Sequence, residues 1–217
     1  MSSADTSLRI SEIFCSIQGE AREVGFPTVF IRLTGCPLRC VWCDTEYAFH
    51  GGEVLEVDVI LEKVRAFNTP RVTVSGGEPL AQRQCLLLLS QLCDAGFQVS
   101  LETSGAMDVS QVDRRVDRVI DVKTPGSGES DKNKIENYDH LHARDQLKFV
   151  LADRADYDWA LLYIDKHGLA DRCEILFSPV YKQLSPTDLA DWLLADQHQI
   201  RMQIQLHKML WGEVPGT

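Results

Sequence analysis

Three cysteines within one short loop constrain this chain more than any other feature. They are Cys36, Cys40 and Cys43, in the run Cys-Pro-Leu-Arg-Cys-Val-Trp-Cys-Asp-Thr. Such a loop suits zinc or an iron–sulfur cluster, because thiolates bind these metals far better than hard cations. No fourth Cys or His lies at ligand spacing, whereas structural zinc sites and ordinary four-iron clusters take four protein ligands. One iron of a four-iron cluster would therefore stay open. A partial zinc knuckle, or three inert buried thiols, is the alternative interpretation.

Composition favours one globular domain over residues 1–217. The chain is 44% hydrophobic and 25% charged, and its length allows a sizeable core. No apolar run reaches the roughly 20 residues that span a bilayer, and residues 1–7 lack the basic and apolar regions of a signal peptide. Seven cysteines, an odd number, indicate reduced thiols rather than a disulfide framework. We expect a cytoplasmic protein with no membrane partner.

The net charge argues against a nucleic-acid partner. It is -10 at neutral pH, and no stripe of Lys and Arg appears along the chain. Phosphate binding draws on such clusters, so a small-molecule substrate is expected and a tRNA-binding role is opposed.

Strand and helix patterns alternate along most of the chain. Alternation of this kind predicts parallel strands with right-handed crossovers, and about six βα units predict an open, partial βα barrel. The segment Ile10 to Gly19 is ambiguous between a short helix and an irregular lead-in. The expected strands cover 28–33, 71–75, 97–102, 118–122, 146–151, 174–177 and 201–206, and the expected helices 57–67, 81–95, 110–115, 157–167 and 186–195.

Polar residues follow several of these strands at their carboxyl ends, where parallel α/β folds bind ligands. Gly76 and Gly77 allow close backbone approach, and Glu102 could bond a ribose diol, although it could equally cap the strand. The polar segment 127–139 has no periodicity and is expected to be a loop or lid.

Other polar positions have two interpretations each. Gln18, with Gly19 and Glu20, could meet a heterocycle or form a surface turn. Arg32 interrupts an apolar strand, so it must meet either an internal acid or a ligand carboxylate. His207 is expected to end a strand on the ligand face, where it could be near substrate or merely exposed.

The remaining cysteines have no ligand spacing. We expect Cys15, Cys85 and Cys93 to serve in packing.

The cysteine spacing, with Trp42 before the last cysteine, resembles the radical SAM superfamily. The run Gly76-Gly77-Glu78-Pro79 resembles the element that holds the methionine amino group of S-adenosylmethionine (SAM) in that superfamily. The resemblance implies a 4Fe-4S cluster on Cys36, Cys40 and Cys43, with SAM at the open iron. It implies SAM contacts from Trp42, Cys43, Asp44, Gly76, Gly77, Glu78, Glu102, Ser104, Asp121, Val122 and Lys123.

Within the superfamily the chain resembles the 7-carboxy-7-deazaguanine synthases. The features that carry this resemblance are Ser-Ile-Gln-Gly-Glu at 16–20, Phe-Ile-Arg at 30–32 and Cys-Asp-Thr at 43–45. Residue 21 is Ala where the family usually has Gly. The resemblance implies Mg²⁺ on Thr45, and substrate contacts from Ile17, Gln18, Gly19, Arg32, Ser75 and His207.

That family converts 6-carboxy-5,6,7,8-tetrahydropterin to 7-carboxy-7-deazaguanine on the route to queuosine, with SAM acting as a cofactor. The resemblance therefore implies a carbon–nitrogen lyase, a homodimer, and an electron donor of the flavodoxin or ferredoxin type. Two rivals stay open at this point. One is a radical SAM activating enzyme that generates a glycyl radical, and the other is a non-catalytic zinc or electron-transfer module.

Overall fold

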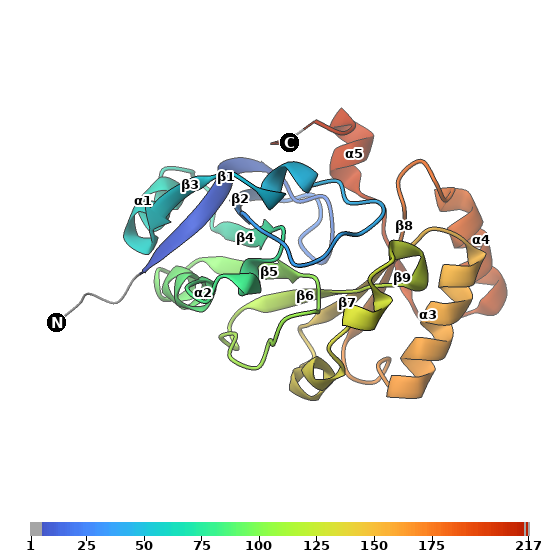
Figure 1. Cartoon of the computed structure of the whole chain (residues 1–217). Helices are drawn as coiled ribbons and strands as arrows, with labels where there is room; N and C mark the ends of the chain where they lie inside the picture. Colours follow the sequence, from blue (N-terminus) through green and yellow to red (C-terminus); the bar gives the residue numbers. More distant parts are fainter. Residues whose placement is uncertain (1–5, 215, 217) are drawn as a thin grey trace.

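One curved sheet organises the molecule. The computed structural model describes residues 6–214 and 216, and in this part of the chain the strands form one nine-stranded sheet in the order β3-β1-β2-β4-β5-β6-β7-β8-β9 (Figure 1). The strands are β1 (Ser7–Ile17), β2 (Pro27–Leu33), β3 (Glu53–Glu56), β4 (Arg71–Gly76), β5 (Gln98–Thr103), β6 (Asp117–Val122), β7 (Gln146–Leu151), β8 (Glu174–Pro179) and β9 (Arg201–Met202). The predicted domain spans residues 1–217, of which 1–5, 215 and 217 lie outside the described residues.

Helices follow most of the strands. The α-helices are α1 (Val57–Arg65), α2 (Cys85–Asp94), α3 (Arg154–His167), α4 (Pro186–Asp196) and α5 (Leu206–Trp211). The 3-10 helices are η1 (Glu46–Phe49), η2 (Pro79–Ala81), η3 (Pro125–Ser127), η4 (Ser130–Lys132) and η5 (Ile135–His140). Within the described ranges, no helix is long and apolar enough to cross a membrane.

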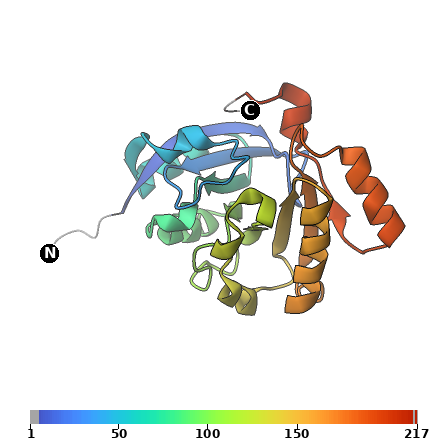
Figure 2. The same ribbon diagram turned by 45° about the vertical axis from the view of Figure 1, so that its right-hand side comes forward.

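The parallel part of the sheet confirms the predicted open barrel. From β2 to β9, each strand is parallel to its neighbour, and β3 and β9 remain separate edges because the sheet does not close. The helices α1 to α4 lie outside the curved sheet, and α5 stands apart from them (Figures 1 and 2). Leu88, Leu89 and Leu92 of α2 are fully buried in the core formed with the strands. Burial of such side chains stabilises the fold by about 1.5–3 kcal/mol each.

The first strand differs from the sequence-based expectation of a short helix or irregular segment. β1 is antiparallel to both β2 and β3, and its register shifts between Ile10 and Glu12. Before this bulge the even-numbered Leu8 and Ile10 are buried in the core, and after it the odd-numbered Ile13 packs against the core. The bulge therefore changes the alternation of the strand and produces a spacing that imitates a helix.

One further prediction is wrong. Residues 110–115 form turns rather than a helix, because the carboxylates of Asp108 and Asp113 accept hydrogen bonds from the backbone N–H groups of Ser110 and Arg115 (2.8 and 2.9 Å). Local side-chain bonds of this kind compete with helix formation. The predicted loop 127–139 has neither a strand nor an α-helix, and its backbone forms η4 and most of η5.

The last predicted strand, 201–206, is only partly a strand. β9 comprises two residues, and the chain then turns into α5, whose first residue is Leu206. No pattern in the sequence indicates the short edge strand β3, which has only four residues and is mostly exposed.

Candidate active site

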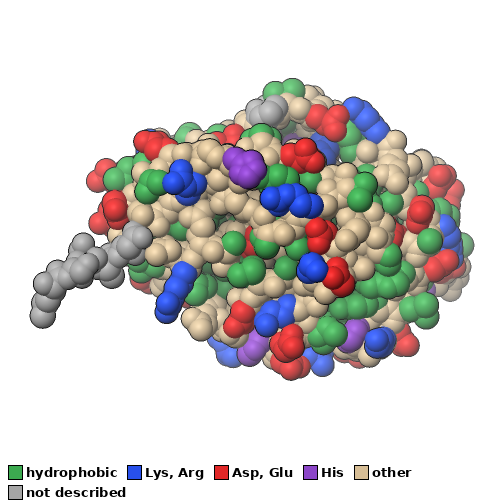
Figure 3. All heavy atoms as spheres, in the orientation of Figure 1, with side chains coloured by type: hydrophobic (Ala, Val, Ile, Leu, Met, Phe, Trp, Pro, Cys, Tyr) green, Lys and Arg blue, Asp and Glu red, His purple; other side chains and the backbone are tan. Residues whose placement is uncertain are grey.

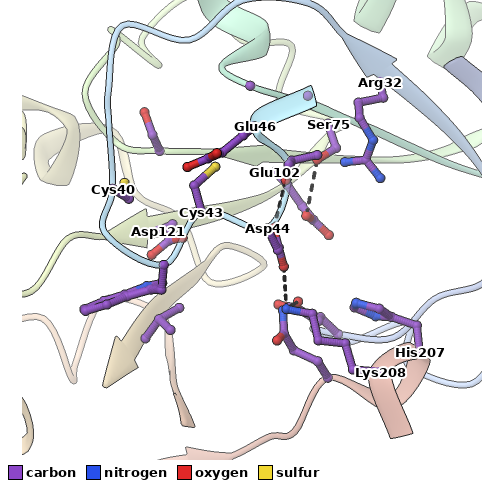
Figure 4. A pocket seen from close by; sticks show the side chains of 18 of the residues that line it. Arg32, Cys40, Cys43, Asp44, Glu46, Ser75, Glu102, Asp121, His207 and Lys208 are labelled. Atoms are coloured by element: carbon purple, nitrogen blue, oxygen red, sulfur yellow. Dashed lines mark hydrogen bonds and ion pairs between the residues drawn. The ribbon is translucent and has the colours of Figure 1, made fainter. Parts of the chain in front are cut away.

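A cavity of about 690 Å³ lies at the carboxyl ends of the parallel strands (Figure 4). Its wall comes from the loop after β2, the ends of β4, β5 and β6, the strand β7, and α5. This placement follows from topology, because the carboxyl ends of parallel strands meet at one edge of a sheet.

The cavity brings together most of the residues that the sequence assigned to cofactors and substrate. Those that line it are Cys36, Cys40, Cys43, Trp42, Asp44, Thr45, Gly76, Gly77, Glu102, Ser104, Asp121, Lys123, Ile17, Gln18, Arg32, Ser75 and His207. Gly19, Glu78 and Val122 are not part of the lining.

The cysteine loop is tied to the segment after β6. The backbone N–H of Arg39 donates to Glu129 Oε1 (2.5 Å), and that of Val41 donates to the carbonyl of Ser127 (3.0 Å). The Arg39 guanidinium closes the loop on itself by donating to the carbonyl of Cys36 (2.8 Å). These bonds hold the loop with all three thiols towards the cavity.

The donor set fits an iron–sulfur cluster. Burial raises the pKa of all three thiols, so they stay protonated until a metal binds them. Across residues 6–214 and 216, no three His, Cys, Asp or Glu side chains are grouped around one point as ligands of a single ion. A structural zinc site is closed by four protein ligands, whereas three thiolates that hold a cluster bind one iron atom each.

The two glycines after β4 are required by the base of the cysteine loop. A Cβ on Gly76 would lie 2.4 Å from the carbonyl oxygen of Leu33, and one on Gly77 would lie 2.3 Å from that of Gly35. The backbone of β4 can therefore approach the cysteine loop only because both residues lack a side chain.

Glu78 acts beneath the cavity rather than in its wall. Its fully buried carboxylate accepts hydrogen bonds from the N–H of Leu80 (2.9 Å), from Thr103 Oγ1 (2.9 Å), and from both the N–H (2.7 Å) and the hydroxyl of Ser104. The side chain thus joins the ends of β4 and β5 and orients Ser104. Val122 is a core residue with 1% of its surface exposed.

Charged side chains alternate at the centre of the cavity. Lys123 Nζ lies 2.8 Å from Asp121 Oδ2, and Lys148 Nζ lies 2.7 Å from Glu20 Oε2. Burial lowers the pKa of both lysines, but the neighbouring carboxylates outweigh it and the net shift is upward. Burial also raises the pKa of Glu102, which favours its neutral, hydrogen-bond-donating form.

Asp121 has one oxygen left for a ligand. Its Oδ1 is buried and has no hydrogen-bond partner within the described part of the chain. A buried acceptor of this kind costs free energy until a donor reaches it, and it lies where the predicted SAM contacts converge.

At the other end of the cavity, Arg32 donates through Nε to Glu12 Oε1 (2.6 Å), so the internal acid that the sequence allowed for is present. Gln18 donates to Thr73 Oγ1 (2.9 Å) and accepts from the N–H of Glu20 (3.1 Å). These bonds orient the Gln18 side chain within the turn, and it also lines the cavity.

His207 lies at the cavity for a different reason than predicted. It belongs to the first turn of α5 and does not end a strand. A Cβ on Gly19 would lie 2.1 Å from His207 Nδ1, so the glycine lets α5 pack against the turn after β1. Burial lowers the pKa of His207 and favours its neutral form.

The turn keeps the left-handed backbone that a glycine would adopt. Ala21 has a φ of 61°, a conformation that costs an L-residue about 1–2 kcal/mol. Its N–H donates to Gln203 Oε1 (2.8 Å) and its carbonyl accepts from Arg201, which hold this conformation.

Asp44 links the cysteine loop to α5. Its carboxylate accepts from Lys208 Nζ (2.6 Å) and from Thr45 Oγ1 (2.8 Å). Burial raises the pKa of Asp44, but the Lys208 ammonium outweighs that effect and holds the pKa well below its usual range.

Comparison with known proteins settles the family. Residues 30–125 match the Radical SAM superfamily. A 7-carboxy-7-deazaguanine synthase from Chlorobaculum tepidum is 46% identical over 213 residues, which cover 97% of each chain. Proteins of the same name from Koribacter versatilis and Thermoplasma acidophilum are 39% and 34% identical, over 94% and 96% of this chain and 97% and 99% of their own. The chain belongs to the 7-carboxy-7-deazaguanine synthase family.

Solved structures agree on the fold. The crystal structure of QueE from Escherichia coli matches with a TM-score of 0.79 at 22% identity, covering 95% of this chain and all of that one. SuiB from Streptococcus suis bound to S-adenosylmethionine matches with a TM-score of 0.55 at 11% identity, covering 79% of this chain and 45% of its own.

Family membership does not favour the rival interpretations. An activating enzyme usually carries cysteines for further clusters, but the other cysteines of this synthase-family chain are dispersed. Cys15 lies on β1, Cys85 and Cys93 on α2, and Cys173 before β8. Cys85 is buried and Cys93 packs against the core, as predicted, whereas Cys15 is exposed, so its predicted packing role is wrong.

Sequence reasoning missed several cavity residues of this synthase-family chain. Lys148 lies on β7, where side chains alternate between the two faces of the sheet, and it points into the cavity. A lysine within this apolar strand could have indicated a functional position. Tyr47 and Lys208 line the cavity, and Glu12 lies behind it against Arg32 and Tyr47; the sequence contains no local pattern for such contacts between distant segments.

Proposed function

We propose that this chain is a single radical SAM domain that converts 6-carboxy-5,6,7,8-tetrahydropterin to 7-carboxy-7-deazaguanine with loss of ammonia. It would act as a cytoplasmic carbon–nitrogen lyase in queuosine biosynthesis. One observation carries the proposal. The three motif cysteines share a single cavity with the polar residues at the ends of β4, β5 and β6. Near full-length similarity to proteins named for this activity supports it.

Cys36, Cys40 and Cys43 would hold the 4Fe-4S cluster. With SAM bound, the cluster would supply radical chemistry, namely abstraction of hydrogen from C6 of the pterin. The protein then fixes geometry and excludes water from the reacting groups.

SAM would lie against the ends of β4, β5 and β6. Gly76 and Gly77 leave backbone room, Glu102 and Ser104 offer polar atoms for the ribose and methionine, and the unpartnered Asp121 Oδ1 accepts a hydrogen bond. Glu78 would act through Ser104, which it orients.

The pterin would lie between the turn after β1 and α5. Arg32 would bind its carboxylate, with Ile17, Ser75 and neutral His207 along its edges. Gly19 would contribute by letting α5 approach.

Thr45 would supply a hydroxyl to Mg²⁺, which prefers hard oxygen ligands and keeps waters and substrate anions. In the free protein this hydroxyl donates to Asp44, so magnesium binding would redirect it. A Thr45→Ala variant is expected to lose most of its magnesium dependence, together with about tenfold or more of kcat/KM. Rates titrated against Mg²⁺ check this, and an unchanged dependence would remove Thr45 from the site.

Outside the chain, the reaction requires a one-electron donor of the flavodoxin or ferredoxin type. We propose a homodimer by analogy with the family. Basic and acidic side chains are interspersed on the face shown in Figure 3, in keeping with a small-molecule substrate rather than a nucleic acid.

Anaerobic reconstitution with iron and sulfide, followed by SAM, a reductant, Mg²⁺ and the carboxylated pterin, tests the function by mass spectrometry of the products. Formation of 7-carboxy-7-deazaguanine is expected. Cleavage of SAM with an untouched pterin would retain the radical SAM chemistry and overturn the substrate. Stoichiometric zinc without iron after anaerobic purification would overturn the enzyme itself.

A further inference from the structure

Arg32 is held by a carboxylate on the neighbouring strand. Glu12 of β1 lies directly opposite Arg32 of β2, at the position that follows the register shift. Glu12 Oε1 accepts from Arg32 Nε at 2.6 Å, and both side chains are largely buried. Bulges re-aim side chains, and without this one Glu12 would face the other side of the sheet.

Two aromatic rings complete the contact. Tyr47 of η1 donates its hydroxyl to the same Glu12 oxygen at 2.8 Å, and its ring centre lies 5.9 Å from Arg32 Cζ. The ring of Phe14 lies at the same distance and stacks on Phe30 (5.2 Å). Three segments of the chain therefore meet at one guanidinium.

The contact leaves one edge of the guanidinium available. Within the described part of the chain, the Arg32 side chain donates hydrogen bonds only through Nε. Its two Nη groups remain, and Figure 4 shows the guanidinium directed into the space bordered by Glu102 and His207. Paired N–H donors of a planar guanidinium match a carboxylate in a bidentate arrangement.

We propose that Glu12, supported by Tyr47, is a positioning residue that fixes Arg32 with its Nη edge towards the cavity and thereby sets the preference for a carboxylated pterin. This inference rests on the proposed function and deepens it. Glu12 carries a negative charge that by itself opposes binding of a second carboxylate. Glu12 therefore favours substrate binding by orienting Arg32, because a preorganised arginine loses less conformational freedom when the substrate binds.

The test compares two ligands of the cluster-loaded enzyme in the presence of SAM and Mg²⁺. One is the carboxylated tetrahydropterin and the other is its neutral 6-carboxamide, and calorimetry gives Kd for each. Glu12→Ala is expected to raise Kd for the carboxylated pterin about tenfold and to leave Kd for the carboxamide unchanged. Glu12→Gln keeps an acceptor for Nε and for Tyr47, and should remain within about threefold of wild type.

A matched control is available near the amino-terminal ends of β2 and β4, the opposite ends from the cysteine loop. Glu23 pairs with Arg71 Nε at the same 2.6 Å and with similar exposure, and neither residue lines the cavity. Glu23→Ala should therefore leave both Kd values unchanged. In an Arg32→Met background, Glu12→Ala should have no further effect, since a residue that acts through another gives a non-additive double mutant.

Equal losses for both ligands in Glu12→Ala and Glu12→Gln would overturn the inference in favour of a general structural role. An additive effect in the Arg32→Met background, or no loss in Glu12→Ala, would overturn it as well. A wild-type enzyme that binds neither pterin would overturn the proposed function and this inference with it. A wild type that prefers the carboxylate, with an equal preference in Glu12→Ala, overturns the inference alone.

Discussion

At the scale of single residues, the three motif cysteines differ from the other four in their surroundings. Their thiols are half-buried at the cavity, on a loop held by Arg39, Glu129 and Ser127. Cys15, by contrast, is exposed on β1 and outside the cavity. Cys15 can therefore serve as a control when any of the three motif cysteines is replaced.

Replacing Cys40 by Ser is expected to abolish cluster assembly, because an alkoxide is a much poorer ligand for iron than a thiolate. Iron and acid-labile sulfide per chain after anaerobic reconstitution measure this. Cys15→Ser should bind iron and sulfide like the wild type. Equal iron and sulfide in Cys40→Ser and wild type would contradict the ligand assignment.

Single residues were predictable where chemistry is local. The cysteine spacing and the strand-end glycines are short-range patterns, and both lie in the cavity wall. Glu78 belongs to the same short run but faces inward, because Thr103 and Ser104 from the next strand bind its carboxylate. Contacts across strands have no signature in a single sequence, which is why Glu12 was missed.

At the scale of elements, α5 is the part of the site that the sequence described least well. It is tied to the cysteine loop by the Lys208–Asp44 pair, in which Lys208 is 9% exposed and Asp44 is 42% exposed. It also packs through His207 against Gly19. One short helix therefore contacts both the proposed cluster loop and the proposed pterin site.

Lys208→Met is expected to destabilise the fold by about 1 kcal/mol at neutral pH, since Asp44 is partly solvated and its pairing is screened. The pKa of Asp44 is depressed in the fold, so the contribution of the pair is complete above the usual pKa of 3.8 and declines as the pH falls below it. Urea unfolding at about pH 7 and about pH 3 should show the difference between wild type and variant shrinking with acidity.

The control for this change is Lys182→Met. Lys182 pairs with Glu213 at 2.7 Å and also lies over the ring of Tyr181, but this pair is exposed. No measurable change in stability is expected there. A Lys208→Met penalty that grows on acidification would contradict the account of Asp44.

Elements were predictable where periodicity and burial agree. The strands β2 and β4 to β8 and the helices α1 to α4 follow their apolar patterns closely. The bulge in β1 imitated helical spacing, and the aspartates at 108 and 113 favoured turns over a helix. β9 ends at Met202, one residue before Gln203. The Gln203 side chain bonds to Ala21 and Glu20 in the turn after β1.

At the scale of the whole molecule, the open sheet is what makes the cavity. The turn after β1 and α5 come from opposite ends of the chain and meet over the strand ends, joined by Glu20, Lys148 and Gln205. Alternating strands and helices predicted the open barrel. The meeting of the two ends depends on the curvature of the sheet, which no local pattern specifies.

Loading the cavity is therefore expected to stabilise the whole fold. A ligand at about 100 times its Kd contributes about 2.7 kcal/mol, which for a chain of this length raises the unfolding temperature by roughly 5–10 °C. Anaerobic calorimetry of the cluster-loaded protein with and without SAM measures the shift. Cys40→Ser, treated identically, should show none, and an equal shift in that variant would place SAM elsewhere.

The central claim is that one cavity holds the cluster, SAM and the pterin side by side. Turnover with pterin deuterated at C6 tests it most directly, with mass spectrometry of the product, the recovered SAM and any 5′-deoxyadenosine. The account predicts deuterium in the adenosyl group, because hydrogen passes directly between neighbouring ligands. Product formed with no deuterium in either adenosyl species would contradict it.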